Sequence, residues 1–137
     1  MEQFLTGNPP SSGDDNVIEV PSTTAIMDRN AALKRAGGDL ELLRELAELF
    51  LADTPPLVAE MERAIATANW HAVHRGAHRL KGAVSNFDAK ILSELLAALE
   101  SRARAEDARE AERLFAQVKS ELARFETELD GFFEEAA

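Results

Sequence analysis

The organisation of this chain follows from one stretch, His71-Ala-Val-His-Arg-Gly-Ala-His-Arg-Leu-Lys-Gly-Ala-Val-Ser-Asn-Phe87. Its apolar residues are separated by steps of four, three, four and three: Val73, Ala77, Leu80, Val84 and Phe87. This spacing is typical of an amphipathic helix that buries one stripe of its surface. We therefore predict a helix over about residues 70–86.

The opposite face of this helix carries an unusual set of side chains. With about 100° of rotation per residue, His78 lies roughly 140° from the centre of the apolar stripe, so we expect it in solvent. Within roughly 60° of His78 lie His71, His74, Arg75, Lys81, Gly82 and Ser85. A cationic strip around an exposed imidazole is unexpected in a chain of 137 residues with a net charge of -10.

The predicted helix contains two glycines, although a glycine inside a helix lowers its stability by about 1 kcal/mol relative to alanine. Gly76 falls on the buried side, where a small residue allows helices to pack closely. Gly82 falls on the outer side, one turn after His78, where no core requires a small residue. We expect Gly82 to leave space for a large partner that approaches the imidazole.

Composition restricts the class of protein. The excess of acidic residues argues against nucleic-acid binding, which needs a basic surface. The chain has no cysteine, which excludes disulfides, thiol catalysis and Cys-ligated metals. No apolar run approaches about 18 residues, and no signal-peptide pattern is present, so we expect no membrane insertion and a cytoplasmic location.

The chain divides into a tail and one domain. Residues 1–22 are polar and rich in turn-forming residues, so we predict a flexible tail or linker. Residues 23–135 are predicted to form a single helical domain. Its short first helix would be capped by Ser22, Thr23 or Thr24 and would end at Gly37-Gly38.

Four longer helices follow in the prediction. The first begins after the cap Asp39 and reaches about Ala68, with a kink or brief break at Pro55-Pro56. The second is the histidine helix, capped by Asn69. Asp88 is expected to cap the third, whose stripe includes Ile91 and Leu92. The fourth runs from about Ala108 to beyond Leu129 and frays at Gly131, although Phe132 and Phe133 can pack back.

No segment alternates with period two over a useful length, so the predicted fold class is all-α. Four amphipathic helices joined by short loops indicate an antiparallel up-down four-helix bundle, here with a short extra N-terminal helix.

The exposed histidine suggests phosphoryl chemistry. A free imidazole has a pKa of about 6.5, so it is largely neutral at pH 7 and can act as a nucleophile. Phosphoryl transfer further needs positive charge around the moving oxygens, which Lys81 can supply and to which Arg75 and Arg79 can add a diffuse field. No Gly-rich nucleotide loop and no carboxylate cluster for magnesium accompany them. Donor, metal and recipient must then come from another protein.

Ala77-His-Arg-Leu-Lys-Gly82 resembles the signature of histidine-containing phosphotransfer (HPt) domains, the shuttles of two-component phosphorelays. The similarity extends in order through Gly38-Asp-Leu-Glu-Leu-Leu-Arg-Glu-Leu46 and Leu99-Glu-Ser-Arg-Ala-Arg104 and covers roughly Ala25 to Leu129. The resemblance implies that His78 is phosphorylated, that Lys81 steadies the phosphoryl group and that Gly82 leaves room for the partner. Asp88 departs from the family, in which many members carry glycine there, and this departure bears on partner choice.

The same resemblance implies the partners. They would be response-regulator receiver domains, whose aspartate and bound magnesium perform the exchange, and a hybrid histidine kinase. The docking face would comprise Gly82, His74, Arg75, Arg79 and Ser85. The chain itself would need no cofactor and would be a phosphocarrier without an ATP site. We expect a monomer, because one chain supplies all four helices.

Two alternatives remain open. The first is a metal site, because His74 and His78 have the spacing of a metal-binding pair. No acidic residue lies between His71 and Ser85 to complete such a site, so we predict that the chain binds no metal. The chain could also be a non-catalytic helical docking bundle, or a fragment of a hybrid sensor histidine kinase. Labelling of the chain by a phosphorylated receiver would separate these functions.

Overall fold

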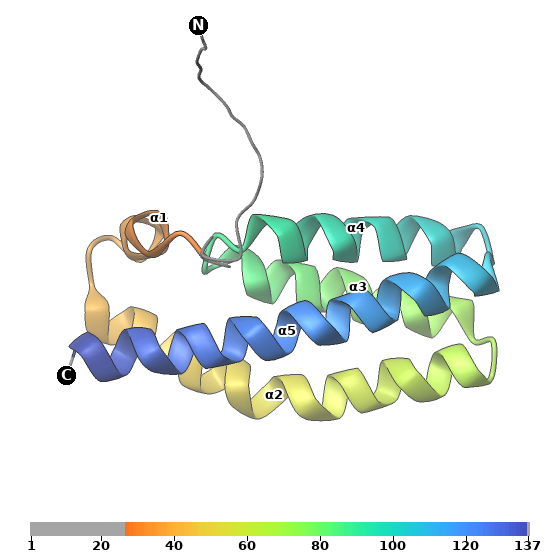
Figure 1. The fold of residues 1–137 in the computed structure, drawn as a ribbon, viewed down its shortest axis with the longest axis horizontal. Helices are drawn as coiled ribbons and strands as arrows, with labels where there is room; N and C mark the ends of the chain where they lie inside the picture. Colours follow the sequence, from red (N-terminus) through yellow and green to blue (C-terminus); the bar gives the residue numbers. More distant parts are fainter. Residues whose placement is uncertain (1–26, 137) are drawn as a thin grey trace, which may run out of the picture.

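The computed structural model describes residues 27–136, so the predicted tail, residues 1–22, lies outside the described part. Five helices follow one another: α1 (Arg29–Arg35), α2 (Leu40–Ala66), α3 (Trp70–Ser85), α4 (Lys90–Arg104) and α5 (Ala108–Ala136). The four long helices lie side by side and alternate in direction, and α1 lies across one end (Figure 1). No strand occurs between residues 27 and 136. The predicted all-α bundle with a short leading helix is confirmed.

Polar side chains begin the first three helices. Asp28, Asp39 and Asn69 each accept a hydrogen bond from the backbone N–H three residues on, at 3.0, 3.1 and 3.3 Å. Such caps satisfy backbone donors that a helix leaves free at its start. The predicted caps Asp39 and Asn69 are confirmed, whereas α1 uses Asp28; Ser22, Thr23 and Thr24 lie outside the described residues.

Two expected helix interruptions are absent. The brief break predicted at Pro55-Pro56 does not occur, since α2 continues through both prolines; the alternative, a kink, stays a prediction. Both prolines are exposed, so water can reach the carbonyl groups left without an N–H partner, while Thr54 beside them is buried. The predicted fraying at Gly131 was wrong, since α5 continues to Ala136, whereas the packing expected of Phe133 is confirmed. Phe133, buried two residues after the glycine, holds this last turn against the bundle.

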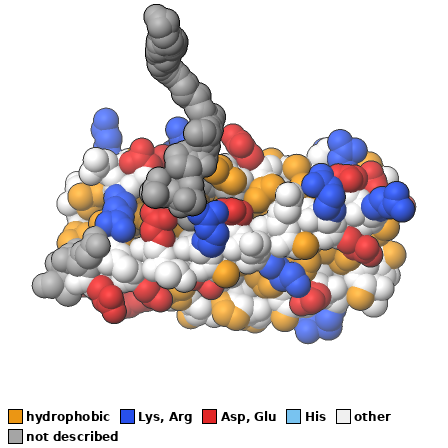
Figure 2. All heavy atoms as spheres, viewed as in Figure 1, with side chains coloured by type: hydrophobic (Ala, Val, Ile, Leu, Met, Phe, Trp, Pro, Cys, Tyr) orange, Lys and Arg blue, Asp and Glu red, His pale blue; other side chains and the backbone are white. Residues whose placement is uncertain are grey.

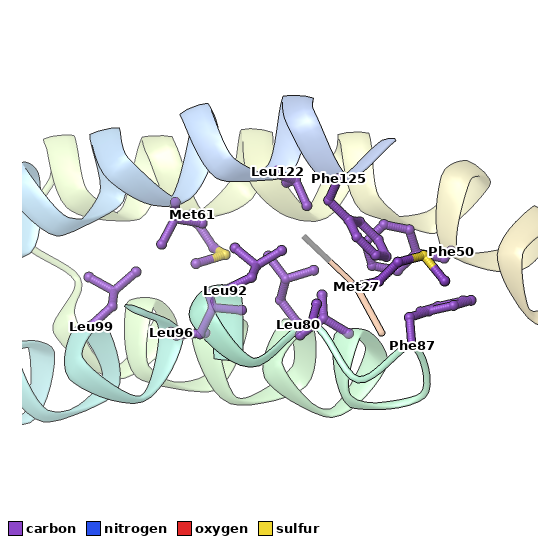
Figure 3. Close-up of a cluster of buried hydrophobic side chains, with 14 of the residues drawn as sticks. Met27, Phe50, Met61, Leu80, Phe87, Leu92, Leu96, Leu99, Leu122 and Phe125 are labelled. Carbon is purple, nitrogen blue, oxygen red and sulfur yellow. The ribbon is translucent and has the colours of Figure 1, made fainter. Parts of the chain in front are cut away.

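Aromatic side chains close one end of the core. Phe50 of α2, Phe125 of α5 and Phe87, which follows α3, meet edge to face with ring centroids 5.2–5.8 Å apart. Edge-to-face pairs contribute about 0.5–1.5 kcal/mol beyond their burial. Figure 3 shows these rings at one end and leucine side chains along the rest of the core. The rings thereby hold the C-terminal end of α3 in the bundle.

The turn after α3 corrects the expectation for Asp88. Its φ is +54°, and the N-cap of α4 is Ala89, which makes no side-chain cap hydrogen bond. The Asp88 carboxylate instead accepts a hydrogen bond from Arg35 of α1 at 3.0 Å, with its side chain 7% exposed. A positive φ favours glycine, which agrees with the glycine of many HPt domains. The acid therefore ties α1 to the α3–α4 turn instead of capping α4.

One member of the predicted α4 stripe is also misplaced. Ile91 is 44% exposed, whereas Leu92, Leu96 and Leu99 are fully buried. Ile91 lies about 100° of helical rotation from Leu92, so it falls beside the buried stripe of α4 and not within it.

Candidate functional site

His78 projects from the middle of α3 into solvent, as predicted. Its side chain is 69% exposed. The neighbouring Ala77 and Leu80 are fully buried, so the packing of the opposite face fixes the direction in which His78 points.

Glu100 of α4 contacts this histidine and was not predicted as a site residue. Its Oε2 lies 2.8 Å from Nδ1 of His78, and its Oε1 lies 2.5 Å from Nζ of Lys81. The Glu100 side chain is only 11% exposed. The sequence contains one signal for it: Glu100 occupies a core position of the α4 stripe, four residues after Leu96 and three before Ala103. A carboxylate at such a position needs polar partners.

Glu100 is ionised at neutral pH. Burial raises the pKa of its carboxyl, but hydrogen bonds from Lys81 and His78, together with their charges, outweigh burial and hold the pKa below its ordinary value of 4.5. An ionised carboxylate only accepts hydrogen bonds. Nδ1 of His78 therefore carries a proton, and in the neutral form of the ring Nε2 keeps a free lone pair at the other side.

His74 belongs to the same cluster. Its Nε2 accepts a hydrogen bond from Arg104 at 2.8 Å and lies 3.8 Å from Oε2 of Glu100. Because arginine is always a donor, this ring nitrogen is the acceptor of the contact. The structure thus turns the His74 side chain towards α4. Within residues 27–136, no group of three or more His, Cys, Asp or Glu side chains could hold a metal ion.

The two glycines of α3 differ as the helical wheel predicted. A Cβ atom on Gly76 would lie 2.5 Å from Cγ of Met61, so the absence of a side chain permits close packing of α2 and α3. A Cβ atom on Gly82 would meet no atom within 4 Å. The packing of the bundle therefore does not require glycine at position 82.

The other predicted docking residues surround the imidazole. Arg75 and Arg79 are exposed on the side of α3 that faces α2, where both line a groove. Ser85 is exposed one turn beyond Lys81 and donates its hydroxyl to the backbone carbonyl of Gly82 at 2.7 Å. All the predicted docking residues lie on α3. The cluster around Glu100, by contrast, combines residues of α3 and α4.

On one helix of a four-helix bundle, an exposed histidine is followed one turn later by a lysine and an open glycine. This arrangement is that of phosphotransfer domains that carry phosphohistidine. The family model described as "Hpt domain" matches residues 45–128, which is more than half of the chain. The chain therefore belongs to the Hpt domain family, and its role is histidine phosphotransfer in a phosphorelay.

Solved structures share the fold. Histidine-containing phosphotransfer protein B from Pseudomonas aeruginosa has a TM-score of 0.74 at 21% identity, with 80% of this chain and 96% of that chain covered. The HPT domain of a Shewanella sensor hybrid histidine kinase has a TM-score of 0.71 at 17% identity, with 80% and 95% covered. A comparison with curated proteins gave no match.

The family defines the general behaviour of the chain. Hpt domains are phosphocarriers that interact with receiver domains and histidine kinases. Among the described helices, none is long and apolar enough to cross a membrane.

Proposed function

We propose that His78 is the phosphorylated residue and that it exchanges the phosphoryl group with the aspartates of receiver domains. The observation that carries the proposal is the contact of Nδ1 with Glu100, because it leaves Nε2 as an oriented nucleophile in solvent. Nε2 attacks phosphorus, the N–P bond forms, and the P–O bond to the aspartate breaks. The aspartate leaves as a carboxylate. In the return step a second receiver aspartate attacks phosphorus and the N–P bond breaks.

Glu100 and Lys81 have separate electrostatic roles in this proposal. When Nε2 gives its lone pair to phosphorus, positive charge spreads over the ring to the Nδ1–H group. The Glu100 carboxylate, 2.8 Å from Nδ1, stabilises that charge. Lys81 is held by Glu100 one turn from His78, from where its ammonium group can bind a phosphoryl oxygen.

The partner supplies what the site does not. A receiver domain would bring the aspartate and magnesium, and a hybrid histidine kinase would supply the phosphoryl group upstream. The chain would act as a cytoplasmic monomer without an ATP site of its own. Gly82, Ser85, Arg75, Arg79 and, at its edge, His74 would form the docking face, since all lie around His78 on α3.

The test is transfer of radiolabel from a phosphorylated receiver domain. Wild-type chain should acquire an acid-labile label, and His78→Ala should acquire none. His71→Ala is the matched control, because His71 is exposed on the same helix and should not alter labelling. Full labelling of His78→Ala would refute the assignment, and receiver binding without labelling would support a docking bundle instead. Incubation with ATP and magnesium alone should leave the chain unlabelled.

A further inference from the structure

A series of side-chain contacts between α3 and α4 ends at His78. Arg104 donates a hydrogen bond to Nε2 of His74 at 2.8 Å, and the same nitrogen lies 3.8 Å from Oε2 of Glu100. That carboxylate oxygen in turn lies 2.8 Å from Nδ1 of His78. The two histidines therefore have one carboxylate oxygen as a common neighbour.

This cluster is more shielded from water than the ion pairs on the outer faces of the bundle. Acidic and basic side chains are interspersed on the face in Figure 2, and the side chains of Arg113 and Glu110, which form one such pair, are 56% and 36% exposed. Those of His74 and Glu100 are only 24% and 11% exposed. Because water screens charges less at a partly buried site, a charge gained by His74 acts strongly on Glu100.

Oppositely charged side chains of α4 bracket His74. In the described residues, the charged side chains in contact with it are Glu100 and Arg104. The other helix packed against α3 is α2, and it brings no charged side chain of residues 40–66 within hydrogen-bond or ion-pair distance of His74. On α3 itself, His71 and His78 lie one turn away on either side. The protonation state of His74 is therefore felt first by the carboxylate that holds His78.

In its neutral form, the His74 ring does not compete for Glu100. Its Nε2 uses its lone pair to accept from Arg104, so this nitrogen has no proton to offer the carboxylate. The separation of 3.8 Å between Nε2 and Oε2 is also too long for a hydrogen bond. Oε2 of Glu100 is thus left to His78.

A proton on Nε2 of His74 would reverse both contacts. Histidine is the side chain whose charge ordinarily changes between about pH 5 and 8, and both nitrogens of the charged ring are donors. A donor at Nε2 would face the guanidinium group of Arg104, which is also a donor and has the same charge. The ring would then turn its N–H to Oε2 of Glu100, which already accepts from His78.

We propose that His74 is a positioning residue for the phosphoryl-accepting imidazole, that it acts only in its neutral form, and that Arg104 keeps it neutral. When His74 takes up a proton from water, its charge partly neutralises Glu100. The carboxylate then stabilises less of the positive charge that develops on the His78 ring during transfer. The inference rests on the proposed function, in which Nε2 of His78 attacks phosphorus. Transfer should therefore slow at mildly acidic pH by more than protonation of His78 alone explains.

The pH profile of transfer at saturating receiver tests the proposal. His74→Gln offers an acceptor oxygen to Arg104 but cannot be protonated. The ratio of its rate at pH 8 to its rate at pH 6 should be about two- to fivefold smaller than the wild-type ratio, an effect of the size found for side chains coupled in one hydrogen-bond network. The pH dependence of the receiver itself cancels, because every variant meets the same receiver.

His71→Gln is the matched control for this comparison. It makes the same chemical change on an exposed side chain of the same helix, so it should keep the wild-type ratio. Equal ratios in His74→Gln and the wild type would overturn the proposal.

Arg104 has a test of its own. Arg104→Leu removes the charge that opposes protonation of His74, so the ratio should rise above the wild-type ratio. Arg102→Leu, in the same last turn of α4, is the control. The effect of Arg104→Leu should disappear when it is combined with His74→Gln. An equal effect in both backgrounds would show that Arg104 acts directly on transfer and would refute its role through His74.

Nitrogen NMR of the free chain tests the contacts without a receiver. As the pH falls, the Nδ1 signal of His78 should respond to protonation of both rings in the wild type, and to protonation of its own ring alone in His74→Gln. If His78→Ala abolishes labelling while His74→Gln leaves the pH profile and this titration unchanged, the positioning inference fails and the proposed function stands. If no receiver labels the wild type, the proposed function fails, and an unchanged titration in His74→Gln would then also remove the inference.

Discussion

Replacing Glu100 with glutamine would remove the charge of this side chain and keep its shape. The carboxylate accepts hydrogen bonds from His78 and Lys81 through its two oxygens. Glutamine offers one acceptor oxygen and one NH₂ group, which is a donor. The NH₂ group then faces either Lys81, where a donor meets a donor, or Nδ1 of His78, which can accept only if the ring proton moves to Nε2.

The expected loss of stability follows from the exposure of the partners. A hydrogen bond to a charged group contributes about 1.5–3 kcal/mol. The His78 and Lys81 side chains are 69% and 33% exposed, so water can replace part of each contact. We expect Glu100→Gln to lower the free energy of unfolding by about 1–2 kcal/mol, measured by urea denaturation at pH 7.

The pH dependence of that difference has a defined sign. The pKa of Glu100 in the folded chain lies below its ordinary value of 4.5. Its contribution to stability is therefore fully present above pH 4.5 and is lost as the pH falls through the lowered folded-state pKa. The difference between wild type and Glu100→Gln should be constant near neutrality and should narrow below pH 4.5.

The same substitution tests the orientation of the nucleophile. Nitrogen NMR of the neutral His78 ring should show the proton on Nδ1 in the wild type, and a larger Nε2–H population in Glu100→Gln, where the NH₂ group can donate to Nδ1. The transfer rate at saturation should fall about tenfold, since misorientation of a reacting group costs up to ~100-fold. Glu94→Gln, an exposed change on the same helix, is the control. A wild-type ring protonated on Nε2, or an unchanged rate in the variant, would refute the reasoning.

Three further predictions concern the neighbours of His78 and the turn after α3. Gly82→Leu should leave the fold intact and block transfer. Gly82→Ala should raise the free energy of unfolding by about 1 kcal/mol. Gly76→Ala should lower the free energy of unfolding, because the added Cβ meets Met61. Denaturation and transfer assays compare these variants, and normal transfer by Gly82→Leu would contradict the steric role. Lys81→Ala should reduce transfer at saturation about 10- to 100-fold by removing charge from the phosphoryl group, and an unchanged rate would exclude that role. Asp88→Ala should be about 1 kcal/mol less stable than Asp88→Gly, because both lose the ion pair with Arg35 but only glycine relieves the positive φ; equal stabilities would contradict this.

The sequence predicted the fold well because helical periodicity is a local signal. The apolar steps of residues 73–87 located α3 and the outward direction of His78, and the same spacing located α4 and α5. Where tertiary packing overrides local preference, part of the prediction failed: the break expected at Pro55-Pro56 is absent, because residues on both sides of the prolines pack into one core. The predicted cap at Asp88 was wrong for a similar reason: its positive φ is set by the path of the chain between two helices, which residue type does not indicate.

The site was predictable only as far as it lies on one helix. His78, Lys81 and Gly82 occur within five residues, so their common face could be read from the wheel. Glu100 is 22 residues from His78 and comes from α4. Its position became visible only with the packing of α3 against α4. A buried carboxylate in an apolar stripe was the available signal, and its partners could not be named without the structure.

In the proposed function, orientation of the imidazole and docking of the receiver fall on opposite sides of α3, and this separation has a kinetic consequence. Glu100 holds the imidazole from the α4 side, while Arg75 lines the groove on the α2 side, and the two share no partner among the described residues. Changes at unconnected sites add in free energy to within about 0.3–0.5 kcal/mol. Glu100→Gln should act on transfer at saturation and Arg75→Glu on KM, so the losses in kcat/KM should multiply in the double variant. A loss well below that product would show that the groove also positions the ring, and that docking and orientation are one step.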